Sequence, residues 1–493
     1  MTCSTPATRH DSCAEVVKTA PTVARQTDSV DLTRPWREYP SAAEMSARTP
    51  PARDRVVDLV RAFSLVVVVF GHSFMAQVAF VDGGVELGNT LAQTRWLQPA
   101  TWVLQVMPLF FAAGAWANAL SYRKAAAYPQ WLNARVRRLV RPVIAYTGFW
   151  IIASPLLLAW NYGIALALLR ISTQLLWFLG AYLLVTALTP LLMRLSTRPV
   201  LACAGWLMGA LLVDGIRLAG GPSAIGLANF VLVWALAGQT GLWAFSTRHR
   251  PSVPAAVALI AAGIGTNALL VGFGPWPLSL VGLSTDEISN MAPPSVVLAI
   301  HCIVLAGLVV VAYSWLTRVS QWEWVWRPTA VVNAAAMTIY LWHLAAMILA
   351  LSVLAGTGQD LPGFSGGSWL WPRLEFWLLF AALTFGLVWL MRPFEHIPLP
   401  WWDAPVKLHP MQSWPYRLRS SVSVVGVVLL AAGLLALSVT GLVGFPFGVT
   451  SSYAGFEFTP GLSILVALAG IGLIRAGAVG VDRSGSSLAA GFE

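Results

Sequence analysis

Twelve long apolar stretches, separated by shorter polar segments, dominate this chain of 493 residues. A helix needs roughly 20 apolar residues to cross the hydrocarbon core of a bilayer, and each stretch meets or approaches that length. Because lipid offers no hydrogen-bonding partners, such segments must satisfy their own backbone groups as helices. The pattern therefore predicts an all-α, polytopic membrane helix bundle of about twelve transmembrane helices. The stretches lie at about 57–80, 100–121, 142–161, 174–193, 200–215, 226–245, 254–274, 295–316, 330–354, 373–391, 421–444 and 460–480.

The basic residues predict how this bundle is oriented. Membrane proteins concentrate Lys and Arg in the loops that stay in the cytoplasm. When the N-terminus is assigned to the inside, only four of the 31 Lys and Arg residues fall on the outer side, namely Arg95, Arg170, Arg217 and Arg373. This asymmetry supports the number of spans and predicts that both termini lie inside.

Composition agrees with a membrane protein. Hydrophobic residues make up 57% of the chain and charged residues 11%, with a mean hydropathy of +0.69, whereas a soluble domain carries about 25% charge. The net charge of +10 comes from short loops and a tail, so we expect it to face anionic membrane lipid and not nucleic acid. The four cysteines show neither metal-binding spacing nor a disulfide framework, and we expect no metal.

The regions outside the central helices differ in composition. Residues 1–52 are polar and lack an apolar run, which predicts a disordered cytoplasmic tail and argues against a cleavable signal peptide. Residues 393–420 form a cytoplasmic connection rich in Trp and Pro. Two further transmembrane helices follow in residues 421–481, and residues 482–493 form a short cytoplasmic C-terminal tail.

Arg61 and His72 in the first apolar stretch are the leading chemical candidates. Eleven helical steps make almost three turns, so the two side chains share a face about 16 Å apart along the axis. This spacing puts a cation near one membrane surface and an imidazole near the midplane, where an ionisable group is costly and usually functional. His72 is a candidate general base. The alternatives are a histidine bonded within the bundle and an arginine that anchors the helix at the headgroups.

Asp58 lies three residues before Arg61, on the same side of the helix, and we expect the two to pair. It is roughly 20 Å from His72 along the axis, too far to orient the imidazole. No other carboxylate is evident at that depth, so the sequence supplies no His–Asp dyad.

A second basic segment, RVRRLVRP at residues 135–142, precedes the third stretch. Arg138 and Arg141 have i, i+3 spacing and could clamp one polyphosphate together, with Arg135 close by. The alternative is that these arginines only determine topology.

Weaker candidates lie in four other segments. His343, in TIYLWHLAAMIL, is a second intramembrane histidine, and Trp177 lies in LLWFLGAYLL. Asp214, at the outer end of the fifth stretch, and Asn290 lie where an outer acceptor could approach. Each of them could instead serve only packing.

Taken as an ordered set, these segments resemble the acyltransferase 3 family of integral membrane acyltransferases. The resemblance rests on DLVRAFSLVVVVFGH, PLFFAAG, RVRRLVRP, LWFLGAY and IYLWH, and it covers about residues 53–392, or ten helices. The last two helices and the Trp- and Pro-rich connection exceed that ten-helix core.

The resemblance implies transfer of an acyl group, often acetyl, from acyl-CoA to a hydroxyl of a sugar, glycan, lipid or metabolite. It also implies a bacterial plasma membrane. In this interpretation Arg61, Arg135, Arg138 and Arg141 hold the donor's phosphates on the inner side. His72 then deprotonates the acceptor hydroxyl or forms a transient acyl-histidine.

Two other classes of function are compatible with the pattern. A secondary transporter could have twelve spans and a midplane histidine that relays protons, but it does not require the aligned arginine cluster. A non-catalytic membrane scaffold could use the extra helices and the basic tail to recruit a partner, although no specific motif favours it.

Overall fold

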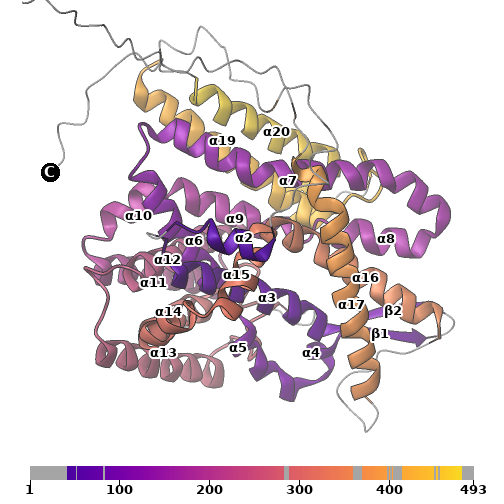
Figure 1. The fold of residues 1–493 in the computed structure, drawn as a ribbon, viewed down its shortest axis with the longest axis horizontal. Coiled ribbons are helices and arrows are strands. Elements are labelled where there is room, and N and C mark those ends of the chain that lie inside the picture. Colours follow the sequence, from indigo (N-terminus) through magenta and orange to yellow (C-terminus); the bar gives the residue numbers. More distant parts are fainter. Residues whose placement is uncertain are drawn as a thin grey trace, which may run out of the picture. The chain divides into compact units, whose positions relative to one another are not determined.

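A computed structural model describes residues 41–50, 53–81, 84–282, 288–358, 369–396, 399, 402, 414–448, 451–453 and 456–479. Within these residues, twelve helical segments are long and apolar enough to cross a membrane, which confirms the predicted fold class. Figure 1 shows their arrangement. Most of the predicted tail 1–52, most of the connection 393–420 and all of residues 482–493 lie outside the described residues.

The helical segments differ widely in length, from four residues to 33. In chain order they are α2 (Ala42–Ala47), α3 (Arg55–Met75), α4 (Thr90–Gln93), η1 (Arg95–Ala100), α5 (Thr101–Leu104), α6 (Met107–Tyr122), α7 (Tyr128–Trp160), α8 (Tyr162–Ile171), α9 (Leu176–Ala187), α10 (Thr189–Leu195), α11 (Pro199–Leu218), η2 (Ser223–Gly226), α12 (Leu227–Ala244), α13 (Val253–Phe273), α14 (Val296–Val319), α15 (Glu323–Ala334), α16 (Ala336–Gly356), α17 (Leu370–Met391), η3 (Arg392–His396), α19 (Tyr416–Thr440) and α20 (Pro460–Gly477).

Two short hairpins were not predicted. Strand β1 (Ala76–Val81) pairs antiparallel with β2 (Gly84–Asn89), and β3 (Ser451–Tyr453) pairs with β4 (Phe456–Phe458). The first hairpin takes up the end of the predicted 57–80 stretch, so α3 ends at Met75. A run rich in valine and phenylalanine before an Asp-Gly-Gly sequence is typical of a hairpin, and it overrides apolar length alone.

Helix α7 begins earlier than the expected 142–161 span. It starts at Tyr128 and runs 33 residues, so RVRRLVRP lies inside the helix and not in a loop before it. Arginine is a good helix former, and Pro129 occupies the first turn, where its missing N–H costs nothing. The arginines of this segment therefore have fixed positions on one rigid element.

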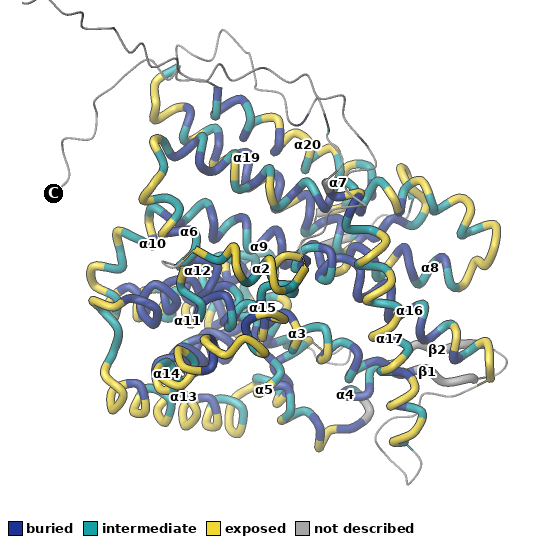
Figure 2. The backbone as a smooth tube through the Cα atoms, viewed as in Figure 1, coloured by how far each residue is buried: buried dark blue, intermediate teal, exposed yellow. Residues whose placement is uncertain are grey.

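Helix α12 lies at the centre of the bundle and packs closely on α6. A Cβ at Gly241 of α12 would be 2.2 Å from the Ala112 carbonyl oxygen of α6. The rings of Phe111 and Trp234 stack with centroids 4.3 Å apart. Figure 2 shows α12 mostly buried, whereas much of α13 is exposed. The small residues of PLFFAAG thus permit close contact between α6 and α12.

The last two helices, α19 and α20, form a tight pair through small residues. A Cβ at Gly433 would be 2.6 Å from the Ala467 nitrogen, and one at Gly470 would be 2.4 Å from the Leu430 nitrogen. Backbones approach this closely only where side chains are absent or small. Helix α19 also packs on α9, where a Cβ at Gly180 would be 3.0 Å from the Ala431 carbonyl oxygen.

This packing predicts a stability difference between two glycines of α20. We expect Gly470→Leu to lower the thermal unfolding midpoint of the detergent-purified protein, because the new side chain would meet the α19 backbone and cost about 1–3 kcal/mol. Gly472→Leu is the matched control, since a Cβ at Gly472 would meet no atom within 4 Å. Equal midpoints for the two variants would contradict the close α19–α20 packing.

Candidate active site

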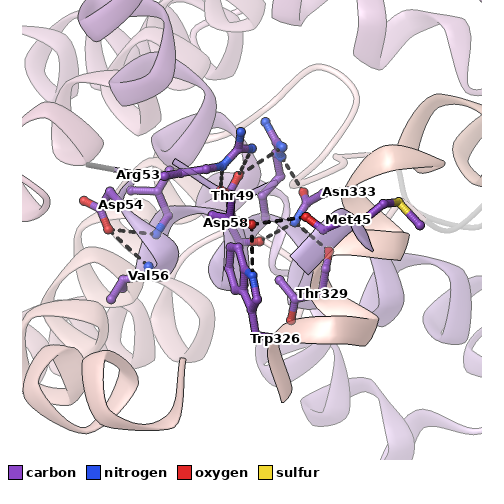
Figure 3. Close-up of polar contacts among 11 residues, drawn as sticks. Met45, Thr49, Arg53, Asp54, Val56, Asp58, Trp326, Thr329 and Asn333 are labelled. Carbon is purple, nitrogen blue, oxygen red and sulfur yellow. Dashed lines mark hydrogen bonds and ion pairs between the residues drawn. The ribbon is translucent and has the colours of Figure 1, made fainter. Parts of the chain in front are cut away.

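Arg61 is held by its own helix and by α15. Its Nη2 donates to Asp58 Oδ1 at 3.2 Å, as the i, i+3 spacing predicted, and its Nε donates to Asn333 Oδ1 at 2.7 Å. Asn333 Nδ2 donates to the Asp58 carbonyl oxygen at 2.8 Å and to that of Thr329 at 3.0 Å. Two of these anchors, Asp58 and Asn333, appear in Figure 3. The guanidinium is therefore fixed in position.

Arg53 shares the same carboxylate. Its guanidinium donates to both oxygens of Asp58, and this hydrogen bonding raises the pKa of Arg53 above its ordinary value. Asp58 is buried. Two arginines around one carboxylate leave one net positive charge at this end of α3.

The chain before α3 is fastened to α15 as well. Trp326 Nε1 donates to Thr49 Oγ1 at 3.2 Å, and Thr49 Oγ1 donates to the Met45 carbonyl oxygen at 3.3 Å (Figure 3). Asp54 caps α3 by accepting from the Val56 and Val57 nitrogens. These bonds fix the position of the first turn of α3 relative to α15.

A cavity of about 840 Å³ lies beside Arg61. Among the described residues, its wall contains six arginines and one acid, Glu395. The arginines come from the start of α3 and from one continuous stretch of α7: Arg53, Arg61, Arg135, Arg137, Arg138 and Arg141. A wall with this excess of cations suits a polyanion.

Arg135 and Arg138 differ in their bonding. Arg135 Nη2 donates to the Ala117 carbonyl oxygen of α6 at 3.4 Å. The exposed Arg138 makes no hydrogen bond or ion pair within the described part of the chain. Arg138 is therefore available to an anion in the cavity.

His72 lies in contact with His343 of α16. His72 Nδ1 is 3.0 Å from His343 Nε2, and the two rings stack with centroids 5.2 Å apart. His343 Nδ1 is 3.0 Å from the Ile339 carbonyl oxygen. From the sequence, His343 was only a separate weak candidate, because its pairing with His72 joins positions 271 residues apart.

The hydrogen bonds of this histidine pair define its tautomers. A carbonyl oxygen only accepts, so His343 Nδ1 carries a proton and donates to Ile339. In neutral His343 the Nε2 atom then holds a lone pair, and the proton between the rings belongs to His72 Nδ1. The lone pair of neutral His72 consequently lies on Nε2, which is the atom able to take a proton.

The cavity and the histidine pair follow the same helix faces. On α3 the wall includes Arg61, Leu65 and Val68, and His72 continues this row at i, i+4, i+7 and i+11. The expectation that Arg61 and His72 share a face agrees with this arrangement. The wall stops at Val68, however, about 6 Å of helix before His72, and His72 does not line the cavity.

Comparison with known proteins identifies this architecture. Residues 54–392 match the model of the acyltransferase 3 family, described as an acyltransferase domain. The chain belongs to the acyltransferase 3 family. No curated protein and no solved structure matches the chain.

As a member of this family, the protein is a multi-pass membrane acyltransferase. The matched region contains the arginine-rich stretch of α7 and both members of the histidine pair. Glu395, α19 and α20 lie after it.

The remaining candidates lie away from the acyltransferase's cavity. Asp214 is buried, pairs with Arg217 at 3.0 Å, and accepts from Asn229 Nδ2 and the Val296 nitrogen. Asn290 is fully buried and bonds to the loop around it. Both side chains are buried and bonded internally, so in this structure they brace the protein.

Trp177 likewise has a packing environment. Its ring lies 6.1 Å from those of Phe230 and Trp234, centroid to centroid. It does not line the cavity.

The anchoring of Arg61 predicts a role for Asn333 that the sequence did not reveal. We expect Asn333→Ala to lower the free energy of unfolding by about 1–3 kcal/mol, because the buried Asp58 carbonyl oxygen and Arg61 Nε each lose a partner. The measurement is thermal unfolding of the detergent-purified protein. Gln321→Ala, at an exposed position just before α15, is the control; an equally small effect of both changes would remove the assigned role.

Proposed function

We propose that this acyltransferase moves an acyl group, with acetyl as the simplest case, from acyl-CoA to a hydroxyl of a sugar, glycan, lipid or metabolite. The observation that carries the proposal is the continuous row on α3. It runs from an arginine-lined cavity to a histidine whose Nε2 is free to accept a proton. The expected setting is a bacterial plasma membrane with the donor on the cytoplasmic side.

Charge supports coenzyme A as the donor carrier. Its diphosphate and 3′-phosphate are anions, and guanidinium groups bind phosphate oxygens through paired hydrogen bonds. Arg138 has no competing partner within the described residues, and Arg61 is held rigid by Asp58 and Asn333. The α7 arginines would hold the phosphates while the pantetheine arm extends along α3.

The proposed reaction uses His72 as a general base. Nε2 of His72 takes the proton of the acceptor hydroxyl while that oxygen attacks the thioester carbonyl. The tetrahedral intermediate then collapses, the carbon–sulfur bond breaks, and the imidazolium returns the proton to the departing thiolate. His343 Nε2 accepts from His72 Nδ1–H throughout and so stabilises the imidazolium.

In this scheme the thioester has to move beyond the last residues that line the cavity. Val68 of α3 and Tyr340 of α16 line the cavity closest in sequence to the two histidines. The arm must therefore advance about one helical turn between these side chains to reach His72. The acceptor would approach His72 from the opposite side of the membrane.

A histidine series tests the chemical step. We expect His72→Ala to reduce acyl transfer about a hundredfold or more, because the general base is lost. His343→Ala should reduce it less, and His343→Gln least, since a glutamine oxygen can still accept from His72 Nδ1. The readout is the acyl mass increment on envelope glycans, lipids and metabolites of expressing cells, compared at equal protein levels.

His249→Ala is the matched control for this series, because His249 lies in the loop between α12 and α13 and does not line the cavity. Undiminished transfer by a well-folded His72→Ala protein would rule out the general-base assignment.

A separate measurement tests donor binding. Arg138→Ala should weaken CoA binding by about tenfold or more, because a charge-assisted hydrogen bond to phosphate is removed. Isothermal titration of the purified protein with CoA gives the Kd. Arg198→Ala removes an exposed arginine outside the cavity and should leave the Kd unchanged. Equal affinities of the Arg138→Ala and wild-type proteins would remove Arg138 from the donor site.

A further inference from the structure

Part of the cavity wall is contributed by residues beyond the family domain. Glu395, in η3, and Trp402 line the same cavity as the α7 arginines, although the matched region ends at residue 392. The function proposed above assigns neither of them a task.

Glu395 has a buried oxygen with no hydrogen-bond partner among the residues that the structure describes. The residue is 8% exposed, and its Oε2 accepts from Thr338 Oγ1 at 2.9 Å. Its Oε1 is also buried, yet it accepts no hydrogen bond from any described residue. A buried acceptor without a donor is costly, so an oxygen of this kind in a cavity wall indicates a ligand that brings a donor.

Trp402 adds an aromatic surface to the same wall. It is 1% exposed and lines the cavity. Its carbonyl oxygen accepts from Arg475 Nη1 of α20 at 2.9 Å, and the Arg475 guanidinium carbon lies 5.7 Å from its ring centroid. Arg475 thus contacts both the backbone and the ring of Trp402.

We propose that Glu395 and Trp402 form the subsite for the adenine base of the CoA donor. This inference rests on the proposed function. Adenine has an exocyclic amine that can donate to Glu395 Oε1 and a flat aromatic ring that can pack against the part of Trp402 that lines the cavity. A carboxylate repels phosphates, so within this cavity it favours the uncharged, amine-bearing end of the donor. The phosphates then lie on the α7 arginines, and the pantetheine arm points towards Val68.

The inference also gives α19 and α20 a function. Arg475 lies on α20, α20 packs on α19 through the glycines described above, and α19 packs on α9. The two helices beyond the family domain therefore hold Trp402 in place through Arg475, which is a positioning residue for the base.

Three ligands distinguish the contribution of the adenine base to binding from that of the rest of the donor. They are CoA, its hypoxanthine analogue, in which a carbonyl replaces the exocyclic amine, and 4′-phosphopantetheine, which lacks the nucleotide. We expect the full-length protein in detergent to bind CoA about tenfold tighter than the hypoxanthine analogue, because the analogue presents an acceptor to Glu395 Oε1. Isothermal titration measures all three Kd values.

Two substitutions assign this preference to residues. Glu395→Gln should abolish the preference for CoA over the analogue, since an amide can donate as well as accept, while it keeps the side chain's shape and the Thr338 bond. Trp402→Leu should weaken CoA and the analogue equally, by about tenfold, and leave 4′-phosphopantetheine unchanged. Glu323→Gln and Trp324→Leu change exposed residues outside this cavity and are the controls.

Arg475 variants test the positioning role. Arg475→Met should weaken CoA but not 4′-phosphopantetheine, and Arg475→Lys should restore part of the difference, because an ammonium can still donate to the Trp402 carbonyl. Should Trp402→Leu fail to fold, the Glu395→Gln comparison still decides the question.

The outcomes distinguish the inference from the function beneath it. A wild-type protein that binds CoA, the analogue and 4′-phosphopantetheine with equal affinity retains its donor but has no base subsite, which overturns the inference alone. A wild-type protein that binds none of the three overturns the proposed donor as well. A CoA preference that survives Glu395→Gln removes Glu395 from the subsite.

Discussion

The need to pair Arg61 at the edge of an apolar bundle governs how α3 meets α15 and α16. Arg61 lies in the second turn of a membrane helix, where an unpaired guanidinium would be expensive. Asp58 and Asn333 satisfy it, and Asn333 belongs to α15, which leads directly into α16. Because α16 carries His343, α3 is joined to the segment α15–α16 a second time at His72. One polar contact to α15 near the start of α3 and one deeper contact to α16 thus set the register of α3 against this segment.

The sequence could predict whatever depends on local periodicity. Apolar length predicted twelve spans, eleven-residue spacing predicted that Arg61 and His72 share a face, and i, i+3 spacing predicted the Asp58–Arg61 pair. Each of these follows from the geometry of a single helix. The correct family resemblance also depended on short motifs within individual helices.

Local periodicity could not predict contacts between residues that lie far apart in the sequence. His343 and Asn333 lie more than 270 positions from His72 and Arg61, which they contact. The sequence around each residue does not indicate which distant residue it contacts. The RVRRLVRP segment was placed before the third span because arginines mark the inner side of a membrane, yet arginine also favours helix, and α7 continues through it. The hairpins were missed because apolar length does not distinguish the end of a helix from a strand.

Hydrogen-bond satisfaction separates the structural polar groups from the functional candidates. Asp214 is more deeply buried than Glu395, but its two oxygens receive bonds from Arg217, Asn229, Trp276 and the Val296 nitrogen. It has nothing left to offer a substrate. Within the described part of the chain, Glu395 keeps one oxygen without a donor, and the bonding pattern derived above uses only the Nδ1 atom of His72. The two groups with spare capacity lie at opposite ends of the proposed path of the donor.

Within the apolar bundle, a second histidine is a less costly partner for His72 than a carboxylate would be. A carboxylate near the bilayer midplane would have to be buried as an anion, and the penalty for desolvating it would be several kcal/mol. In the proposed mechanism, a neutral His343 is oriented by the Ile339 carbonyl oxygen, which the helix supplies without cost in charge. The pair would then direct His72 Nε2 towards proton transfer while adding no charge to the apolar interior until the acceptor is deprotonated.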